Sequence, residues 1–334
     1  MIRRMPAKPQ QSPSRVPERW RDIAGPVGHL PTGERNAITD VPGVRVGHSQ
    51  AKSGQRTGVT VVDPPSLPAL AGTAVVNGTG ELTAKLEIDE TGQIETPVYL
   101  CGTHAVGTVY QAAIIASGRG PEDVVIPVVG ETWDGDLADS RTVVAEDVTA
   151  AIDALSEDVA EGTVGGGTGM QLFEYPGGIG TASRQVGDWH VGVLLQCNYG
   201  EREYLDLLGH TLEPAVRGAR GDGSCIAVCA TDAPLTAQQL KRLALRPLLG
   251  LARTGSYGSE GSGEIGLAFS TVTDGGLEND QLNPIFAAAY ESAHEAVMNC
   301  LVAAKSAERL DGTMQDAFPV ELARGLARDR RQTP

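Results

Sequence analysis

The sequence predicts a mixed α/β fold, on three observations. Short apolar runs rich in β-branched residues are bounded by Gly, Pro or Asn, as buried strands are. They alternate with longer stretches in which apolar residues recur at intervals of three and four, which is typical of helices. The 334 residues include 42 glycines and only 4% aromatic residues, and glycine supplies tight turns and close backbone approach. We therefore expect a loop-rich enzyme rather than a helical scaffold.

The composition is that of a globular protein and excludes several classes of function. The chain is 41% hydrophobic and 21% charged, with a mean hydropathy of −0.13. A formal charge of −15, with no basic run beyond the N-terminal tail, argues against a nucleic-acid or anionic-membrane partner. No stretch approaches the roughly 18 consecutive apolar residues of a membrane helix, and the N-terminus lacks the apolar core of a signal peptide. We expect a cytoplasmic protein with small-molecule or protein partners.

Cysteine and histidine usage gives no sign of a metal site. The five cysteines are odd in number and widely spread, which fits neither a disulfide framework nor a CxxC site. The six histidines are isolated, and no HExxH or His/Cys cluster occurs. We expect reduced, buried thiols, no metal and no cofactor.

The order of elements follows from the same patterns. Residues 1–33 are rich in Pro, Arg and Ser without periodicity, so we expect a flexible N-terminal extension or an arm over a neighbour. Strands are expected at 58–62, 73–76, 124–129 and 191–197. Helices are expected at 104–117, 142–155 and 283–305, the last with Asn283 as cap and Pro284 in its first turn.

The stretch 200–223 is polar and rich in Gly, Pro and charge, and we expect an exposed loop. It ends at Gly223, and Ser224 opens an apolar, strand-like run. Self-cleaving N-terminal-nucleophile hydrolases have this layout. The serine hydroxyl attacks the preceding carbonyl, glycine tolerates the strained backbone, and the freed α-amine, with a reference pKa of about 7.7–8.0, becomes a base beside the nucleophile. The alternative is an ordinary Gly-Ser turn.

The segments after Ser224 extend this pattern. Thr236 to Gln239 form a capping box, and leucines mark one face of the following helix, which Pro247 is expected to kink. A Gly/Ser-rich loop, 252–264, and a strand, 265–271, come next. The order from 224 to 271 is therefore strand, helix, loop, strand.

Ten segments, in order along the chain, carry a resemblance to a known family. They are NAITDVPGVRVGH (36–48), VVNGTGELT (75–83), THAVGTVYQAAI (103–114), PVVGETWDG (127–135), GTVGGGTGM (162–170), GGIGTASR (177–184), QCNYG (196–200), ATDAPLTAQQLKRLA (230–244), GLARTGS (250–256) and GSGEIGLAFS (261–270). The chain resembles, from about residue 34 to 326, the D-esterase/L-aminopeptidase and β-peptidyl aminopeptidase family, which includes nylon-oligomer hydrolases.

The resemblance implies a single catalytic domain made as an inactive precursor. Family members cut themselves before a Ser or Thr, which here is Ser224 after Gly223. An α chain, 34–223 with its extension, and a β chain, 224–334, would fold together as a four-layer αββα sandwich of DmpA-type topology, similar to other N-terminal-nucleophile hydrolases. The αβ units would assemble as a homotetramer.

The family's motifs also imply roles for particular residues. Ser262 and Glu264 match the GSG(D/E) motif beside the nucleophile and would hold its amine. Asn198 matches the donor that stabilises the oxyanion, and Glu131 matches a carboxylate that would pair with the substrate's ammonium. Trp133 stands where many relatives have a tyrosine, so an indole N–H replaces the hydroxyl in this expected substrate-binding position.

Each of these residues also has an ordinary structural interpretation. Ser262 and Glu264 would then be solvated residues of a Gly-rich loop, Asn198 a turn former ahead of Gly200, and Glu131 a helix N-terminal or loop charge. Ala138, where relatives have Asn, is expected to alter the pocket.

Three other functions compete with the aminopeptidase interpretation. Nucleotide binding is disfavoured because neither Gly-rich stretch, 165–170 or 178–183, completes GxGxxG and no GK[ST] occurs. An unprocessed, non-catalytic homologue and an endo-hydrolase of ω-amino-acid oligomers both remain alternatives. We expect a self-cleaving serine aminopeptidase or amidase acting on short peptides, amides or esters through an acyl-enzyme on Ser224, with α-L, α-D or β preference left open.

Overall fold

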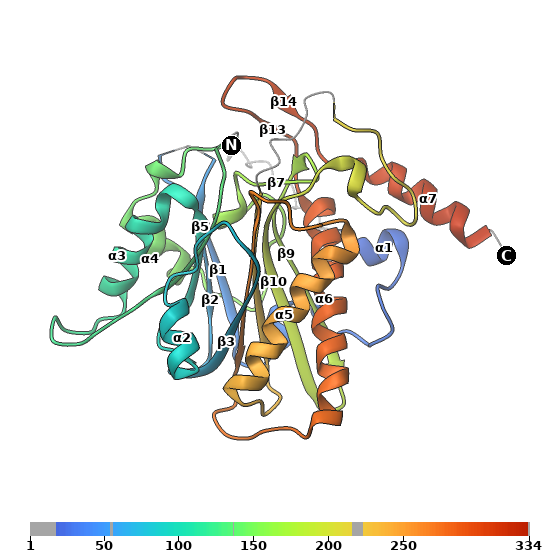
Figure 1. Ribbon diagram of the computed structural model, residues 1–334. Helices are drawn as coiled ribbons and strands as arrows, with labels where there is room; N and C mark the ends of the chain where they lie inside the picture. The colour runs from blue at the N-terminus through green and yellow to red at the C-terminus, as the bar shows by residue number, and fades with distance from the viewer. Residues whose placement is uncertain (1–17, 54–55, 136, 216–222, 333–334) are drawn as a thin grey trace, which may run out of the picture.

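The computed structural model describes residues 18–53, 56–135, 137–215 and 223–332, which form two stacked β-sheets between two layers of helices. Figure 1 shows the four layers side by side, with α3 and α4 on one outer side and α5 and α6 on the other. The predicted αββα sandwich is confirmed.

The first sheet has four strands in the order β1-β2-β5-β6. Helices α3 (Val106–Ala116) and α4 (Ala145–Asp153) cover its outer face, where Val59, Tyr99 and Val109 share one buried cluster. The strands are β1 (Arg45–Gln50), β2 (Gly58–Asp63), β5 (Val98–Gly102) and β6 (Val128–Thr132).

The second sheet has six strands in the order β4-β3-β12-β11-β10-β9. Helices α5 (Ala237–Thr254) and α6 (Leu282–Ala303) pack on its outer face. The strands are β3 (Ala69–Gly78), β4 (Gln93–Ile94), β9 (Gly178–Val186), β10 (Trp189–Asn198), β11 (Ser224–Thr231) and β12 (Gly263–Ser270).

The central strands are buried on both faces. In β11, Ile226 and Val228 belong to the core between the two sheets, whereas Cys225, Ala227 and Cys229 belong to the core under α5 and α6. Strands covered on both sides need apolar residues at every position, and for this reason β11 appears in the sequence as a continuous apolar run.

Most expected elements are present, with two differences at their ends. The expected strand at 124–129 is wrong for 124–127, because β6 begins only at Val128; Pro127 has no N–H for a ladder and Val124 is exposed. Helix α6 begins at Leu282 with Gln281 in the capping position, so Asn283 lies inside the first turn with Pro284. The capping box at Thr236 is confirmed by two hydrogen bonds to Gln239.

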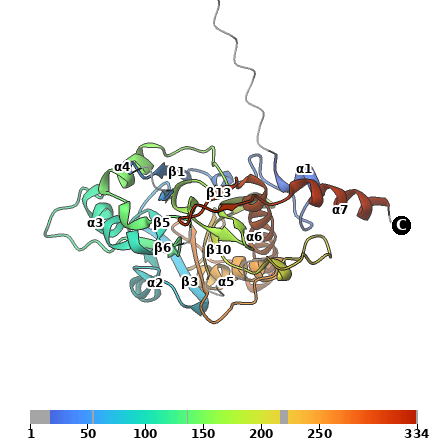
Figure 2. The same cartoon turned by 90° about the horizontal axis from the view of Figure 1, so that it is seen from above.

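Two short hairpins lie at one end of the sandwich. Figure 1 places β7, β13 and β14 together at the upper end of the central strands, and the view from above in Figure 2 agrees for β13 over β10. The hairpins are formed by β7 (Gln171–Leu172) with β8 (Tyr175–Pro176), and by β13 (Ala307–Glu308) with β14 (Met314–Gln315). Helix α2 (Lys85–Thr91) contacts β3 and β4, and α1 (Trp20–Ala24) contacts α7 (Val320–Gln332). Within the described ranges, no helix is both long and apolar enough to cross a membrane.

Residues 18–33 differ from the flexible extension that the sequence predicts, and residues 1–17 of that extension lie outside the described residues. Trp20 and Ile23 are buried in the core beside α6, and the Trp20 N–H donates to Asn299 Oδ1 at 3.0 Å. The backbone N–H groups of His29 and Leu30 both donate to Glu291. This segment is therefore an arm that packs on its own chain.

A buried ionic cluster holds this arm. Arg184 is fully buried and donates to Glu295 at 2.7 Å and to Glu291 at 3.2 Å, while Arg21 from the arm pairs with Glu295 at 2.7 Å. Arg184 also donates to the Val27 carbonyl at 2.7 Å. Because a buried charge left without its partner is costly, the arm and α6 stabilise each other.

Replacing Glu295 tests this cluster. Glu295→Ala removes the nearer of the two buried carboxylates that pair with Arg184, as well as the partner of Arg21. We therefore expect the free energy of unfolding to fall by about 3–5 kcal/mol, measured by urea unfolding. The control is Arg35→Ala, which removes the exposed pair with Glu157 and is expected to cost less than about 1 kcal/mol. Equal losses of unfolding free energy in Glu295→Ala and Arg35→Ala would contradict the stabilising role of the buried ionic cluster.

Candidate active site

Strand register brings the candidate nucleophile and oxyanion donor together. Ser224, the first residue of β11, pairs with Asn198 of β10 on one side and with Gly263 of β12 on the other. Directly paired residues of antiparallel strands have Cβ atoms about 4.5–5.5 Å apart. Alternation along the strands puts Ser224 and Asn198 on the face between the two sheets, with Ile226 and Leu194.

The peptide bond before Ser224 is closely enclosed. The Gly263 N–H donates to the Gly223 carbonyl oxygen at 3.1 Å. A Cβ at Gly223 would lie 2.7 Å from the Asn198 carbonyl oxygen and 2.8 Å from Tyr199 Cα. A side chain at position 223 would clash with both atoms, so the space there requires glycine.

Ser262 and Glu264 form a pair immediately beside this bond. The Ser262 hydroxyl donates to Glu264 Oε1 at 2.5 Å, and both residues are buried. Burial raises the pKa of Glu264 above its usual range, and hydrogen bonds from Ser262 and Ser256 offset part of that rise. Glu264 Oε2 is buried and has no hydrogen-bond partner among the described residues. The pair is thus poised to accept a further N–H or O–H donor.

The orientation of the Asn198 side chain follows from one contact. Its Oδ1 accepts the backbone N–H of Gln171 at 2.8 Å. An amide that uses its oxygen in this way has its two N–H donors on the other side. Asn198 therefore presents N–H groups, the kind of donor that stabilises a developing oxyanion.

Glu131 and Trp133 follow each other on and after β6. Glu131 is buried, and its carboxylate accepts the Glu81 N–H at 2.9 Å and the Thr103 hydroxyl. Burial raises its pKa, and the same two hydrogen bonds lower it. A Cβ placed on Gly80 would lie 3.4 Å from Glu131 Oε1 and 3.6 Å from Gly263 Cα, so this carboxylate lies near the start of β12, the strand that pairs with β11.

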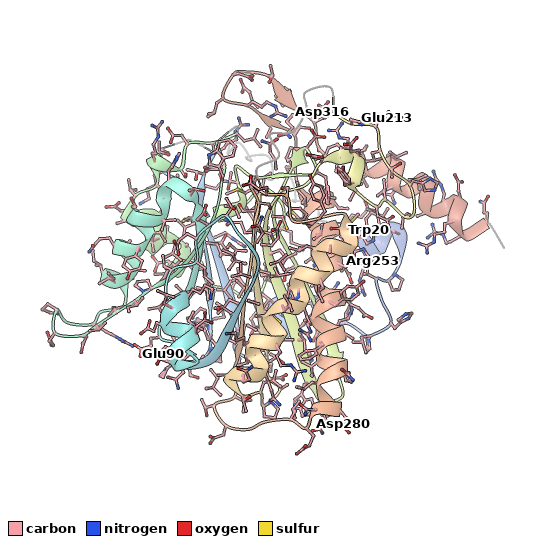
Figure 3. The ribbon with its side chains drawn as sticks, viewed as in Figure 1. Trp20, Glu90, Glu213, Arg253, Asp280 and Asp316 are labelled. Atoms are coloured by element: carbon pink, nitrogen blue, oxygen red, sulfur yellow. The ribbon has the colours of Figure 1, made fainter. Side chains whose placement is uncertain are left out.

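A cleft of about 750 Å³ opens at this end of the sandwich. Trp133 lines it, but Glu131 and Ser224 do not; Ser224 is 4% exposed. Figure 3 labels Asp316, one of its lining residues, at the upper end of the molecule, far from Asp280 at the lower end. The lining includes Asn198, Gly223, Ser262, Glu264, Glu174, Glu201, Arg202, Arg309, Asp311, Met314 and Gln315.

The site thus combines residues that the sequence singled out with others that it did not. Ser224, Asn198, Gly223, Ser262 and Glu264 meet at one end of three adjacent strands. Four further residues that hydrogen-bond in the site had no role in the sequence analysis. Glu81 and Thr103 lie within quoted family segments that assign them no role, and Gln171 and Gln315 lie outside those segments.

The described residues contain no candidate metal site. Among the described residues, no group of three His, Cys, Asp or Glu side chains could hold an ion. The five cysteines are all free and buried, and Cys225 packs in the core under α5 and α6.

Known proteins with similar sequence or structure are peptidases. The model of "Peptidase family S58" matches residues 36–315. The β-peptidyl aminopeptidase BapA of Sphingosinicella microcystinivorans is 40% identical, over 94% of this chain and 93% of that protein. A β-aminopeptidase structure from Burkholderia sp. has a TM-score of 0.85 at 37% identity, covering 93% of this chain and 99% of that one.

A further structure supports the comparison of folds. The L-aminopeptidase D-Ala-esterase/amidase of Ochrobactrum anthropi has a TM-score of 0.81 at 34% identity, over 95% of this chain and 99% of that one. It is described as a prototype for the serine aminopeptidases and as a new variant of the N-terminal-nucleophile hydrolase fold. The two-sheet sandwich described above is this variant fold.

Proposed function

This chain belongs to peptidase family S58, and on that premise we propose that it is a self-cleaving serine aminopeptidase with Ser224 as its nucleophile. The observation that carries the proposal is the register at the end of the sheet. Ser224 stands between Asn198 and Gly263, and the carbonyl it would attack already accepts the Gly263 N–H. An N-terminal nucleophile needs this combination of hydroxyl, donor and enclosed peptide bond.

Self-cleavage begins with the intact Gly223–Ser224 bond. The Ser224 Oγ attacks the Gly223 carbonyl carbon, forming a C–O bond, and the Gly263 N–H stabilises the negative charge on the oxygen. The C–N bond then breaks, and the hydroxyl proton passes to the nitrogen. Water hydrolyses the resulting ester, which leaves a carboxylate on Gly223 and a free α-amine on Ser224.

Turnover uses the same groups in the cut protein. The Ser224 α-amine takes the hydroxyl proton as Oγ attacks the substrate carbonyl and returns it to the leaving amine. Asn198 Nδ2 donates to the oxyanion. Glu264 Oε2, which has no partner among the described residues of the uncut chain, accepts from the new amine, and Ser262 holds the carboxylate in place. Water then releases the acyl group.

The charge of the cleft supports a substrate with a free ammonium group. Five carboxylates line the cleft against two arginines; the carboxylates are Glu174, Glu201, Glu264, Asp311 and Asp316. Opposite charges bind best where they are partly desolvated. We assign Glu131 to the ammonium because it is a buried carboxylate near the start of β12 and matches the family's carboxylate. Trp133 is assigned to the wall that shapes the acyl pocket. The proposed substrates are short peptides, amino-acid amides or esters.

Self-cleavage is tested by intact mass under denaturing conditions. Wild-type protein should give two chains, 1–223 and 224–334, and Ser224→Ala one chain, because the variant lacks the attacking hydroxyl. The matched control is Ser270→Ala at the opposite end of β12, whose hydroxyl bonds the Ala233 carbonyl; it should give two chains. Cleavage of Ser224→Ala, or a cut elsewhere, would contradict the proposal.

Activity is tested on paired anilides of β-homoalanine, L-alanine and D-alanine. The cut protein should release aniline from at least one of them, and N-acetylation of that substrate should abolish turnover because it removes the ammonium group. Their relative kcat/KM values rank α-L, α-D and β preference. Hydrolysis only of ω-amino-acid oligomers would favour the endo-hydrolase, and cut protein inactive on every substrate would contradict the aminopeptidase.

We further propose a cytoplasmic homotetramer of αβ units that binds neither nucleic acid nor membrane. Exposed apolar side chains near β3 and α2, among them Val75, Val76 and Leu86, support an interface there. Five free cysteines suit a reducing compartment. Light scattering of the purified protein should give four times the mass of one αβ unit, and Leu86→Glu should lower that mass; a monomer in both would contradict the assembly.

A further inference from the structure

The turn between β7 and β8 has an unusual backbone. Phe173 has φ 49° and Glu174 has φ 60°, so two consecutive residues other than glycine occupy the left-handed region. Two-residue hairpin turns need this conformation, but they usually meet the need with Asn and Gly. A turn made of Phe and Glu persists only where surrounding contacts hold it.

Two groups of contacts hold this turn. On the inner side, the Phe173 N–H donates to the Tyr199 carbonyl at 2.8 Å, and its buried ring packs edge-on against Tyr199 with centroids 5.3 Å apart. On the outer side, Gln315 Nε2 donates to Gln171 Oε1 and to the Glu174 carbonyl, each at 2.8 Å. One amide nitrogen therefore connects the first residue of β7 to the second residue of the turn.

Gln315 comes from a distant part of the sequence. It ends β14 in the C-terminal hairpin and is 4% exposed. Arg202 adds a weaker bond to the Glu174 carbonyl at 3.2 Å, and its guanidinium lies 4.1 Å from the centroid of the Tyr175 ring. Both views of the molecule place this hairpin over the end of the central strands (Figures 1 and 2).

The turn has one consequence inside the site. Gln171, held through its side chain by Gln315, donates its backbone N–H to Asn198 Oδ1. That bond selects the orientation in which the Asn198 amide nitrogen can donate. If Gln171 moves or rotates, the Asn198 amide oxygen loses this hydrogen bond and can turn toward the reacting carbonyl.

We propose that Gln315 is a positioning residue that orients Asn198 for oxyanion stabilisation by fixing the β7–β8 turn. The inference rests on the proposed function, because it takes Asn198 as the oxyanion donor. Gln315 does not touch the nucleophile; it acts through Gln171. The C-terminal hairpin thereby contributes to catalysis as well as lining the cleft.

The test is a double-mutant cycle between Gln315→Met and Asn198→Ala. Methionine keeps the length of the side chain and removes both donations. Gln315→Met should lower kcat roughly tenfold or more while KM stays within about twofold. This is smaller than the ~100–1,000-fold loss of kcat on removal of an oxyanion donor, because Asn198 is still present but less well oriented. In the Asn198→Ala background the same change should have an effect of less than about twofold, because residues that act through one group are not additive.

The matched control is Gln239→Met. Gln239 also donates to a loop carbonyl, that of Leu277 at 2.6 Å, and caps α5 away from the cleft. It should lower the melting temperature and leave kcat unchanged. Every variant is first checked for cleavage by intact mass, and one that stays uncut is co-expressed as its two separate chains, so that turnover is always compared between cut proteins.

The outcomes separate this inference from the proposed function. Wild-type protein without turnover would contradict the proposed function itself. Active wild type with an unchanged kcat in Gln315→Met would overturn the positioning role alone. An equal loss of kcat in the presence and absence of Asn198 would also overturn it, because Gln315 would then act by another route.

Discussion

The register of three adjacent strands is the constraint on which the site depends. β11 is paired with β10 and β12 in such a way that Ser224 lies between Asn198 and Gly263. A shift of one residue would turn every side chain of β11 to the opposite face and send Ser224 into the helix-side core. The cores above and below β11 hold this register, because both faces of the strand are buried. The four-layer sandwich therefore positions the nucleophile through its packing.

Burial also explains the hydrogen-bonding of the site. Polar groups at the end of a buried strand are costly unless they are satisfied, and the structure provides partners for most of them: Gln171 for Asn198, Ser262 for Glu264, and Glu81 with Thr103 for Glu131. Glu264 Oε2 is the exception among these carboxylates. Glu264 follows Gly263, the residue that pairs with Ser224. In the proposed mechanism its free oxygen accepts from the ammonium group that cleavage creates.

Local patterns and family motifs predicted most of the fold and the principal residues. Strands such as β11 and helices such as α6 are visible as apolar runs and periods, and the motifs located Ser224, Asn198 and Glu264. The contacts of Gln315 were beyond reach, because they join segments far apart in sequence and support a turn whose residues contradict local turn preference. The arm at 18–33 was misjudged for a similar reason, since Arg21 finds its buried partner on α6.

In the proposed mechanism, Ser224, as a new N-terminus, carries the acyl group during turnover. The most direct measurement is mass spectrometry of the cut protein quenched in acid during hydrolysis of a slowly turned-over amino-acid ester, followed by peptide mapping. We expect an acyl adduct on the peptide that begins with Ser224, and we expect hydroxylamine treatment to remove it. An adduct on another residue, with Ser224 unmodified, would contradict the role of Ser224 as the nucleophile.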